Sequence, residues 1–191
     1  MTLWDWKSTF YHYRQTVFPF SLILKKEIRN IEDLMAKCNL NGAPVLDVAT
    51  GPGTMLEVLP AAAKVVASDR SLKMLNKVAL QRAACYVAAD STHLPFKANS
   101  FKLISAVGVF EYQKHPQVFL RELHRVIMAS GMLLLTYSQI NFFNHLRYLW
   151  GHRLHLMTHQ RMTQMLTETG YALSRMKQSL MQRQMLVAPL K

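Results

Sequence analysis

The stretch Val45-Leu46-Asp47-Val48-Ala49-Thr50-Gly51-Pro52-Gly53 decides the fold. A short apolar run that ends in a glycine-containing turn is typical of a buried strand that feeds a helix, here expected from Thr54 onward. Glycines let the backbone approach a ligand closely, and ligands of doubly wound sheets bind outside the carboxyl ends of the strands. The turn at 49–53 is therefore the candidate cofactor site.

The same strand-to-helix pattern recurs along the chain. Further strands are predicted at 64–68, 85–89, 101–107 and 131–137, and helices at 21–38, 72–83, 117–128 and 160–169. Alternating signals of this kind imply parallel βαβ units with right-handed crossovers. The predicted fold is α/β, a doubly wound, Rossmann-like, mostly parallel sheet with helices on both faces. The last twenty residues predict two more short strands, at 171–178 and 183–190.

Composition sets the broad class of the protein. The chain has 191 residues, half of them hydrophobic, which fits a single globular domain over 1–191. Its net charge of +12 favours anionic partners such as nucleic acid, acidic lipid headgroups or phosphorylated substrates. Two cysteines provide no disulfide framework, and we find no signal peptide and no apolar run of about 18 residues, so a cytoplasmic location is expected.

Two more acids follow predicted strands. Asp69 comes directly after the strand at 64–68, where its carboxylate can accept both hydroxyls of a ribose, and Asp90 follows the strand at 85–89, within reach of an adenine amino group. Together with Asp47, these acids would repel one another unless a ligand offered donors and a positive centre. A sulfonium cofactor offers all of these.

At this point the sequence resembles the class I S-adenosylmethionine-dependent methyltransferases, in particular the small-molecule branch that includes the ubiquinone and menaquinone biosynthesis enzymes. The matching segments cover about half of the chain in the expected order. They are VLDVATGPG (45–53), ASDRS (67–71), AADSTHLPFKANSFKLI (88–104), VFEY (109–112) and FLRELHRVIMASGMLLLTYS (119–138).

The resemblance implies roles for individual residues. Asp47 and Gly51 would lie near the methionine portion of S-adenosylmethionine, Asp69 would hold the ribose, Asp90 and Ser91 would flank the adenine, and Met74 would pack on the adenine face. The full set of cofactor-binding residues is predicted as Asp47, Ala49, Thr50, Gly51, Gly53, Asp69, Arg70, Met74, Asp90, Ser91 and Val107. S-adenosylhomocysteine is the expected product.

Three positions depart from the family pattern. Ala49 stands where the family usually has its first glycine, and its Cβ either crowds the methionine carboxylate or points aside. Lys102 replaces an acid, and Ala129-Ser130-Gly131 replaces Pro-Gly-Gly, which affects only turns and surface charge. Ala49 alone bears on cofactor affinity.

The resemblance also divides the chain by role. Residues 1–44 would form a helical lid rich in aromatic side chains, from which Tyr11 or Tyr13 reaches the sulfonium, and the alternative is a packed helix without a role at the cofactor. Residues 45–138 would form the cofactor-binding core, and residues 139–191 a substrate cap with the C-terminal strands. Glu111 and Tyr112 follow the fourth strand and are the candidate catalytic base or positioning groups. The alternative for Glu111 is a cap or salt bridge to the next helix.

Several alternatives stay open. A dinucleotide-binding domain also has a glycine turn followed by an acid, but GPGTML lacks the third glycine of that fingerprint and Asp47 would repel a pyrophosphate. A nucleic-acid methyltransferase is suggested by the charge, although VFEY stands where base-flipping enzymes carry an NPPY-like turn. A non-catalytic cofactor-binding protein is the third option. The histidines at 145, 152, 155 and 159 have no carboxylate close by in sequence, so we expect no metal site.

The acceptor is expected to be small or lipid-like. The stretch 141–160 is aromatic and basic, and Phe142, Phe143, Leu146, Leu149 and Trp150 can share one helical face, with Arg147 and Arg153 to the side. Such a segment either rests on an anionic membrane surface, making a peripheral contact, or closes on the core as a helical cap.

Overall fold

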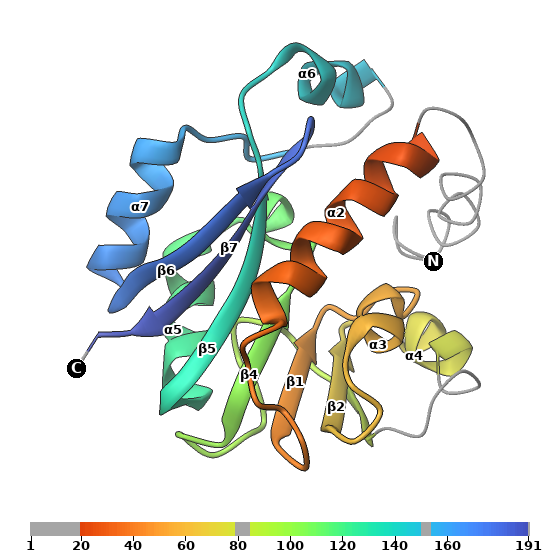
Figure 1. The fold of residues 1–191 in the computed structure, drawn as a ribbon, viewed down its shortest axis with the longest axis vertical. Helices are drawn as coiled ribbons and strands as arrows, with labels where there is room; N and C mark the ends of the chain where they lie inside the picture. The colour runs from red at the N-terminus through yellow and green to blue at the C-terminus, as the bar shows by residue number, and fades with distance from the viewer. Residues whose placement is uncertain (1–19, 79–84, 150–153, 191) are drawn as a thin grey trace.

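A computed structural model describes residues 20–78, 85–149 and 154–190. These residues form a seven-stranded sheet in the order β3-β2-β1-β4-β5-β7-β6 (Figure 1). The strands are β1 (Pro44–Val48), β2 (Lys64–Asp69), β3 (Cys85–Ala88), β4 (Phe101–Ala106), β5 (Ile127–Ser138), β6 (Tyr171–Gln178) and β7 (Gln182–Pro189). The predicted α/β fold is confirmed, and both C-terminal strands are present.

The strand order reverses beside β1. β1 pairs in parallel with β2 on one side and with β4 on the other, and β2–β3 and β4–β5 are parallel as well. Only the C-terminal hairpin runs the other way, because β7 is antiparallel to both β5 and β6. The reversal leaves a crevice at the carboxyl ends of β1 and β4, which is where ligands bind in open α/β sheets.

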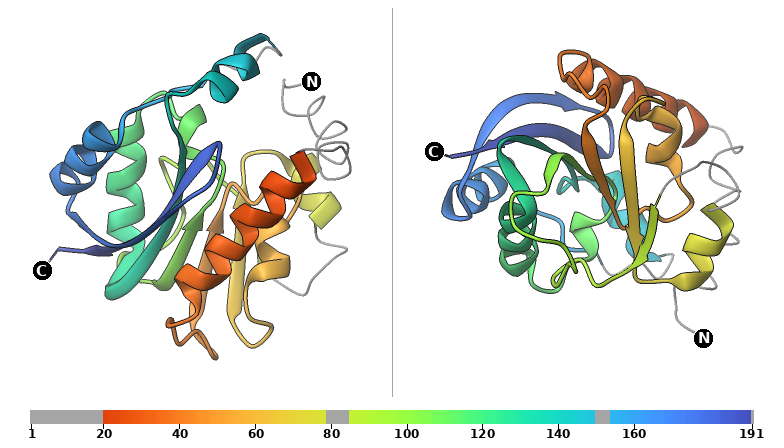
Figure 2. Two further views of the ribbon diagram at one scale, coloured as in Figure 1. Left: turned by 45° about the horizontal axis from the view of Figure 1, so that its top comes forward. Right: turned by 90° about the horizontal axis from the view of Figure 1, so that it is seen from below.

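Helices cover both faces of the sheet (Figures 1 and 2). The helices are α2 (Phe20–Met35), α3 (Thr54–Val58), α4 (Leu72–Val78), α5 (Pro116–Val126), α6 (Phe142–Leu149) and α7 (His159–Glu168), together with the 3-10 turn η1 (Phe110–Tyr112). Side chains of α2, α3 and α4 share one buried cluster, whereas those of α5 and α7 belong to the other. The arrangement is the doubly wound one that the sequence predicts.

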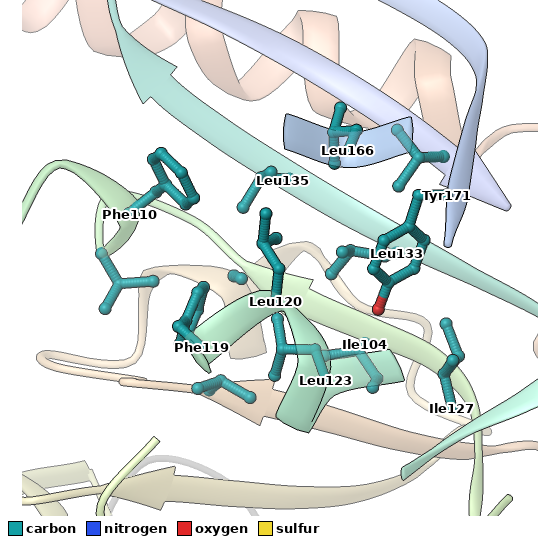
Figure 3. Close-up of a cluster of buried hydrophobic side chains, with 14 of the residues drawn as sticks. Ile104, Phe110, Phe119, Leu120, Leu123, Ile127, Leu133, Leu135, Leu166 and Tyr171 are labelled. Atoms are coloured by element: carbon teal, nitrogen blue, oxygen red, sulfur yellow. The ribbon is translucent and has the colours of Figure 1, made fainter. Parts of the chain in front are cut away.

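The alternation of the strands divides the core between the two faces. In β5, Leu133 and Leu135 point into the cluster under α5 and α7, while Leu134 points into the cluster under α2. Figure 3 shows the first of these clusters, in which Leu120 and Leu123 of α5 lie against Ile104 of β4 and Leu133 of β5. Because both faces are buried, the central parts of these strands are mostly apolar.

The junction of α5 and β5 differs from the sequence prediction, and α2 ends at Met35, three residues before the predicted end. The helix expected to reach residue 128 ends at Val126, and β5 begins at Ile127, four residues before the predicted strand. The carbonyls of Arg125 and Val126 accept hydrogen bonds from the N–H groups of Asn99 and Ser100. The loop before β4 therefore supplies hydrogen-bond donors to the last carbonyls of α5. The chain becomes extended two residues before the predicted end of the helix.

Candidate active site

A cleft of about 990 Å³ opens at the carboxyl ends of β1, β2 and β4. Its walls come from the turns after these strands, from the first half of α2, and from the turn between β6 and β7. Twelve of the thirteen residues predicted for the site line it: Asp47, Ala49, Thr50, Gly51, Asp69, Arg70, Met74, Asp90, Ser91, Val107, Glu111 and Tyr112. Gly53 is the remaining one, and it lies buried at the N-terminus of α3.

The turn after β1 has a left-handed backbone at alternate positions. Ala49 has φ 55°, Gly51 52° and Gly53 88°. The Gly53 N–H closes the turn on the Thr50 carbonyl at 2.9 Å, and the Thr50 N–H bonds to Ser68 of the neighbouring strand. Position 49 is thus one where glycine fits best, and its alanine adopts the conformation at a steric cost of about 1–2 kcal/mol.

Asp69 ties two turns together. Its Oδ2 accepts a hydrogen bond from the N–H of Gly51 at 2.9 Å, and its Oδ1 accepts one from the N–H of Ser71 at 2.8 Å. The carboxylate therefore stands beside the glycine turn with both oxygens oriented by backbone donors. Each carboxylate oxygen can accept more than one hydrogen bond, so a ligand hydroxyl can be added without breaking this arrangement.

Asp47 is almost completely buried at the end of β1. Burial raises the pKa of its carboxyl to about 6, while hydroxyls of Ser105 and Thr50 oppose the rise. Ser105 Oγ donates to Oδ1, whereas the Thr50 hydroxyl is close but falls short of hydrogen-bond geometry. Asp47 Oδ2 and Thr50 Oγ1 are accordingly two buried polar atoms without a hydrogen-bond partner among the described residues, and both residues line the cleft.

Asp90 follows β3 and lines the cleft. Its Oδ1 accepts hydrogen bonds from the N–H and the hydroxyl of Thr92, at 2.9 and 2.7 Å, and the backbone bond is the main reason that the pKa of Asp90 is lowered. Ser91 accepts a bond from Gln113 Nε2 at 3.3 Å, which links this loop to the one after η1. Asp90 is thus an ionised acceptor held by its own turn.

The remaining predicted cofactor-binding residues differ in burial. Met74 of α4 is buried at the cleft wall, Val107 follows the last residue of β4, and Arg70 lines the rim with an exposed side chain. Met74 and Val107 give the cleft apolar surface between the acids, whereas Arg70 adds positive charge at the opening.

Glu111 is fully buried in η1, which follows β4, and it lines the cleft. Its Oε1 accepts a hydrogen bond from Ser138 Oγ at 2.9 Å and one from Gln182 Nε2 at 3.4 Å. Neither bond is a helix cap or a salt bridge, the two structural roles that the sequence left open for this residue. Tyr112 lies next to it and also lines the cleft.

Sequence reasoning missed the part of the cleft wall formed by α2 and the hairpin next to Glu111. Glu27 of α2 accepts a hydrogen bond from Ser179 Oγ at 2.8 Å, and Ser179 Oγ also accepts the N–H of Gln182 at 3.0 Å. Glu27 and Gln182 both line the cleft. No local pattern singles them out, because they lie about 150 residues apart and meet only through the hairpin after β6. Ser105 could have been noticed from the sequence, because it is a polar residue inside the mostly apolar strand β4.

Some predicted features lie outside the described residues. These include the aromatic residues before Phe20, among them Tyr11 and Tyr13, and also Trp150 and Arg153. Among the residues that the structure does describe, no group of three or more His, Cys, Asp or Glu side chains is placed to hold a metal ion. None of the described helices is long and apolar enough to cross a membrane.

The described residues form an open α/β domain whose strand order reverses beside β1, with a left-handed glycine turn after β1 and acids at the end of β2 and after β3, the place where such domains bind ligands. Within it, residues 46–135 match the family model described as a methyltransferase domain. We therefore assign this segment to the methyltransferase domain family, and the resemblance to S-adenosylmethionine-dependent methyltransferases is confirmed.

Curated relatives match over the same region. A malonyl-[acyl-carrier protein] O-methyltransferase of Legionella pneumophila is 31% identical over 114 residues, covering 56% of this chain and 40% of the relative. A demethylmenaquinone methyltransferase of Renibacterium salmoninarum is 39% identical over 96 residues, covering 49% of this chain and 40% of the relative. The match thus spans about two fifths of the length of these relatives.

Solved structures share the fold over most of the chain. The magnesium protoporphyrin IX methyltransferase of Synechocystis PCC 6803 with bound SAH has a TM-score of 0.78 at 16% identity and covers 97% of both chains. A putative methyltransferase from Bacillus halodurans C-125 has a TM-score of 0.68 at 25% identity, covering 80% of this chain and 71% of that one.

Proposed function

We propose that this chain transfers a methyl group from S-adenosylmethionine to a small, apolar or lipid-like acceptor. The observation that carries the proposal is the convergence, in one cleft of about 990 Å³, of the glycine turn, the acids after β1, β2 and β3, and the buried Glu111. The family model and the relatives named as methyltransferases support the same reaction.

The part of the cleft that lies beside the glycine turn, Asp69 and Asp90 fits the methyl donor, S-adenosylmethionine. Asp47 Oδ2 and Thr50 Oγ1 are buried without partners beside the glycine turn, where an amino acid's ammonium group would satisfy them. Asp69 offers two oriented oxygens to a ribose, and Asp90 with Ser91 lines the end that would take the adenine. When bound, this cofactor supplies an already activated methyl group on a sulfonium.

The task of the protein is then mainly alignment of the acceptor, which can lower the barrier by several kcal/mol. The cleft continues past the glycine turn between Ile23 and Leu24 of α2 and Met181 of the hairpin. These side chains suit an apolar acceptor body. Glu111, held by Ser138 and Gln182, provides one carboxylate that can orient the acceptor's nucleophilic group and accept its proton. Tyr112 is the neighbouring positioning group.

A transfer assay tests this proposal. The protein is incubated with S-adenosylmethionine labelled on the methyl group and a total lipid extract, and the label in the organic phase is counted. We expect label to enter the organic phase with wild-type protein and, at a cofactor concentration below saturation, much less label with Asp69→Ala. Binding of the cofactor without transfer to lipid, quinol or acyl-thioester acceptors would contradict catalysis and support a cofactor-binding role instead.

A further inference from the structure

The mouth of the cleft carries an exposed apolar patch. The patch consists of Ile140, Phe142 and Phe143, at the start of α6 and just before it, and Leu180, at the turn between β6 and β7. Each of these four side chains is between 46% and 70% exposed. The rings of Phe142 and Phe143 contact each other edge to face, with centroids 5.9 Å apart. Apolar side chains that are clustered rather than scattered mark an interaction surface.

Hydrogen bonds fix α6 and the hairpin turn to each other. Asn141 Nδ2 donates to the carbonyl of Leu180 at 2.9 Å, and the buried Asn144 donates to the carbonyls of Gln139 and Met181, at 2.9 and 2.7 Å. With Asn144 turned inward, Phe142 and Phe143 are held outward. The helix cannot turn them into the core without breaking these bonds, so the patch is a built surface.

The patch adjoins the acceptor end of the cleft. Met181, which follows Leu180, lines the cleft, as does Gln182, which contacts Glu111. Figure 1 shows α6 and the β6–β7 turn on the same side of the molecule as the first turn of α2, whose Ile23 and Leu24 form the apolar wall. An apolar molecule that leaves the patch therefore meets the acceptor end directly.

Acids and cations both line the cleft, and the excess of positive charge lies in the C-terminal part of the sequence. Exposed cations, Arg70, Lys73 and Lys114, stand among the residues that line the cleft. Residues 139–191 contain seven Lys or Arg and a single acid, Glu168, which forms a salt bridge with Arg161 at 3.8 Å. Apolar side chains together with an excess of cations match the interface of a membrane that contains acidic lipid.

We propose that this face of the protein docks on an anionic lipid bilayer, with the patch inserted at the headgroup level and the cleft mouth facing the membrane. The proposal rests only on the exposed apolar patch and the cations of this face. It would survive a failure of the methyl-transfer proposal, because vesicle binding needs no cofactor and no turnover.

Vesicle co-sedimentation at low salt tests the docking surface. The protein is mixed with vesicles of phosphatidylglycerol and phosphatidylcholine, or of phosphatidylcholine alone. We expect pelleting with the mixed vesicles only, falling as salt is added. The double variant Phe142→Ser/Phe143→Ser should lower the partition coefficient at least about tenfold. Leu180→Ser provides an independent check at the other half of the patch.

The matched control lies on the edge strand β6. Leu173 and Met176 are 40% and 38% exposed and do not line the cleft, so Leu173→Ser/Met176→Ser removes exposed apolar surface elsewhere on the molecule, and it should pellet like the wild type. Circular dichroism melts check that each variant is folded. Equal pelleting of both double variants, or no pelleting with acidic vesicles at low salt, would overturn the proposal.

Two other occupants of the surface give different results. Binding to single-stranded RNA that is unchanged in Phe142→Ser/Phe143→Ser, without vesicle binding, would show that the charge serves nucleic acid. A dimer in size-exclusion chromatography that the same variant dissociates would show that a second copy covers the patch. Either result would overturn the membrane assignment.

Discussion

The backbone N–H of Gly51 donates to Oδ2 of Asp69 at 2.9 Å, so the turn after β1 and the acid after β2 form one unit. The second oxygen of the same carboxylate holds the N–H of Ser71 at the start of α4. This arrangement positions the carboxylate before any ligand arrives, and it makes Asp69 both a structural and a binding residue.

Replacing Asp69 should weaken cofactor binding. We expect Asp69→Ala to cost about 1–3 kcal/mol in affinity for S-adenosylhomocysteine, because charge-assisted hydrogen bonds to the ribose are lost. The melting temperature should fall as well, since the N–H groups of Gly51 and Ser71 lose their acceptor. Titration calorimetry measures the affinity, with Glu57→Ala, an exposed acid of α3, as the control. A folded Asp69→Ala with unchanged affinity would place the ribose elsewhere.

Asp47 should make stability depend on pH. Burial raises its pKa from 3.8 to about 6 in the folded protein, so the folded state binds this proton more tightly than the unfolded state does. Its contribution to stability is therefore present below about pH 4 and is lost as the pH rises through 6. Asp47→Asn should remove this dependence and raise the free energy of unfolding at pH 8 by up to about 3 kcal/mol.

The same substitution should impair ligand binding. An ammonium group beside Asp47 requires the ionised carboxylate, so Asp47→Asn should bind S-adenosylmethionine more weakly, and wild-type affinity should fall as the pH drops below 6. Urea unfolding at pH 4 and pH 8 checks the stability, and calorimetry at the same two pH values checks the affinity. A variant that is less stable than the wild type at pH 8 would contradict the claim that burial raises the pKa of the Asp47 carboxyl.

Ala49→Gly should relieve strain. Alanine at φ 55° costs about 1–2 kcal/mol, whereas glycine there costs about 0.4–1 kcal/mol through the greater freedom of the unfolded chain. We therefore expect the variant to gain up to about 1 kcal/mol in unfolding free energy. Denaturant melts measure the gain. The matched substitution Ala61→Gly, at an exposed position of the loop before β2, should destabilise slightly or do nothing. A loss of more than 1 kcal/mol in Ala49→Gly would contradict the strain argument.

Glu111→Gln separates catalysis from cofactor binding. The substitution keeps the size of a fully buried side chain but removes the charge and the ability to accept a proton. Methyl transfer should fall about 10²–10⁴-fold if the acceptor must lose a proton, while the affinity for S-adenosylhomocysteine changes less than twofold. Ser138→Ala, which removes one bond to Oε1, should give a smaller loss. Full activity in Glu111→Gln would leave Glu111 with a packing role only.

Local sequence patterns predicted the part of the fold and site that repeats along the chain. An apolar strand with an acid at or just after its end recurs from β1 to β3, so Asp47, Asp69 and Asp90 could be found without a structure, and the glycine turn follows β1 alone. Sequence patterns did not predict the contacts between segments that are distant in the chain. Glu27 and Gln182 reach the cleft only because α2 packs against the antiparallel hairpin, and no spacing records that contact. The end of α5 was misplaced because a loop from before β4 caps it.

Titration calorimetry with S-adenosylhomocysteine tests the central claim most directly. The account predicts one molecule bound per chain, a melting temperature that rises with ligand concentration, and no competition by NAD, whose pyrophosphate Asp47 would repel. The absence of measurable heat with both S-adenosylhomocysteine and S-adenosylmethionine at millimolar concentration, from a folded protein, would contradict it.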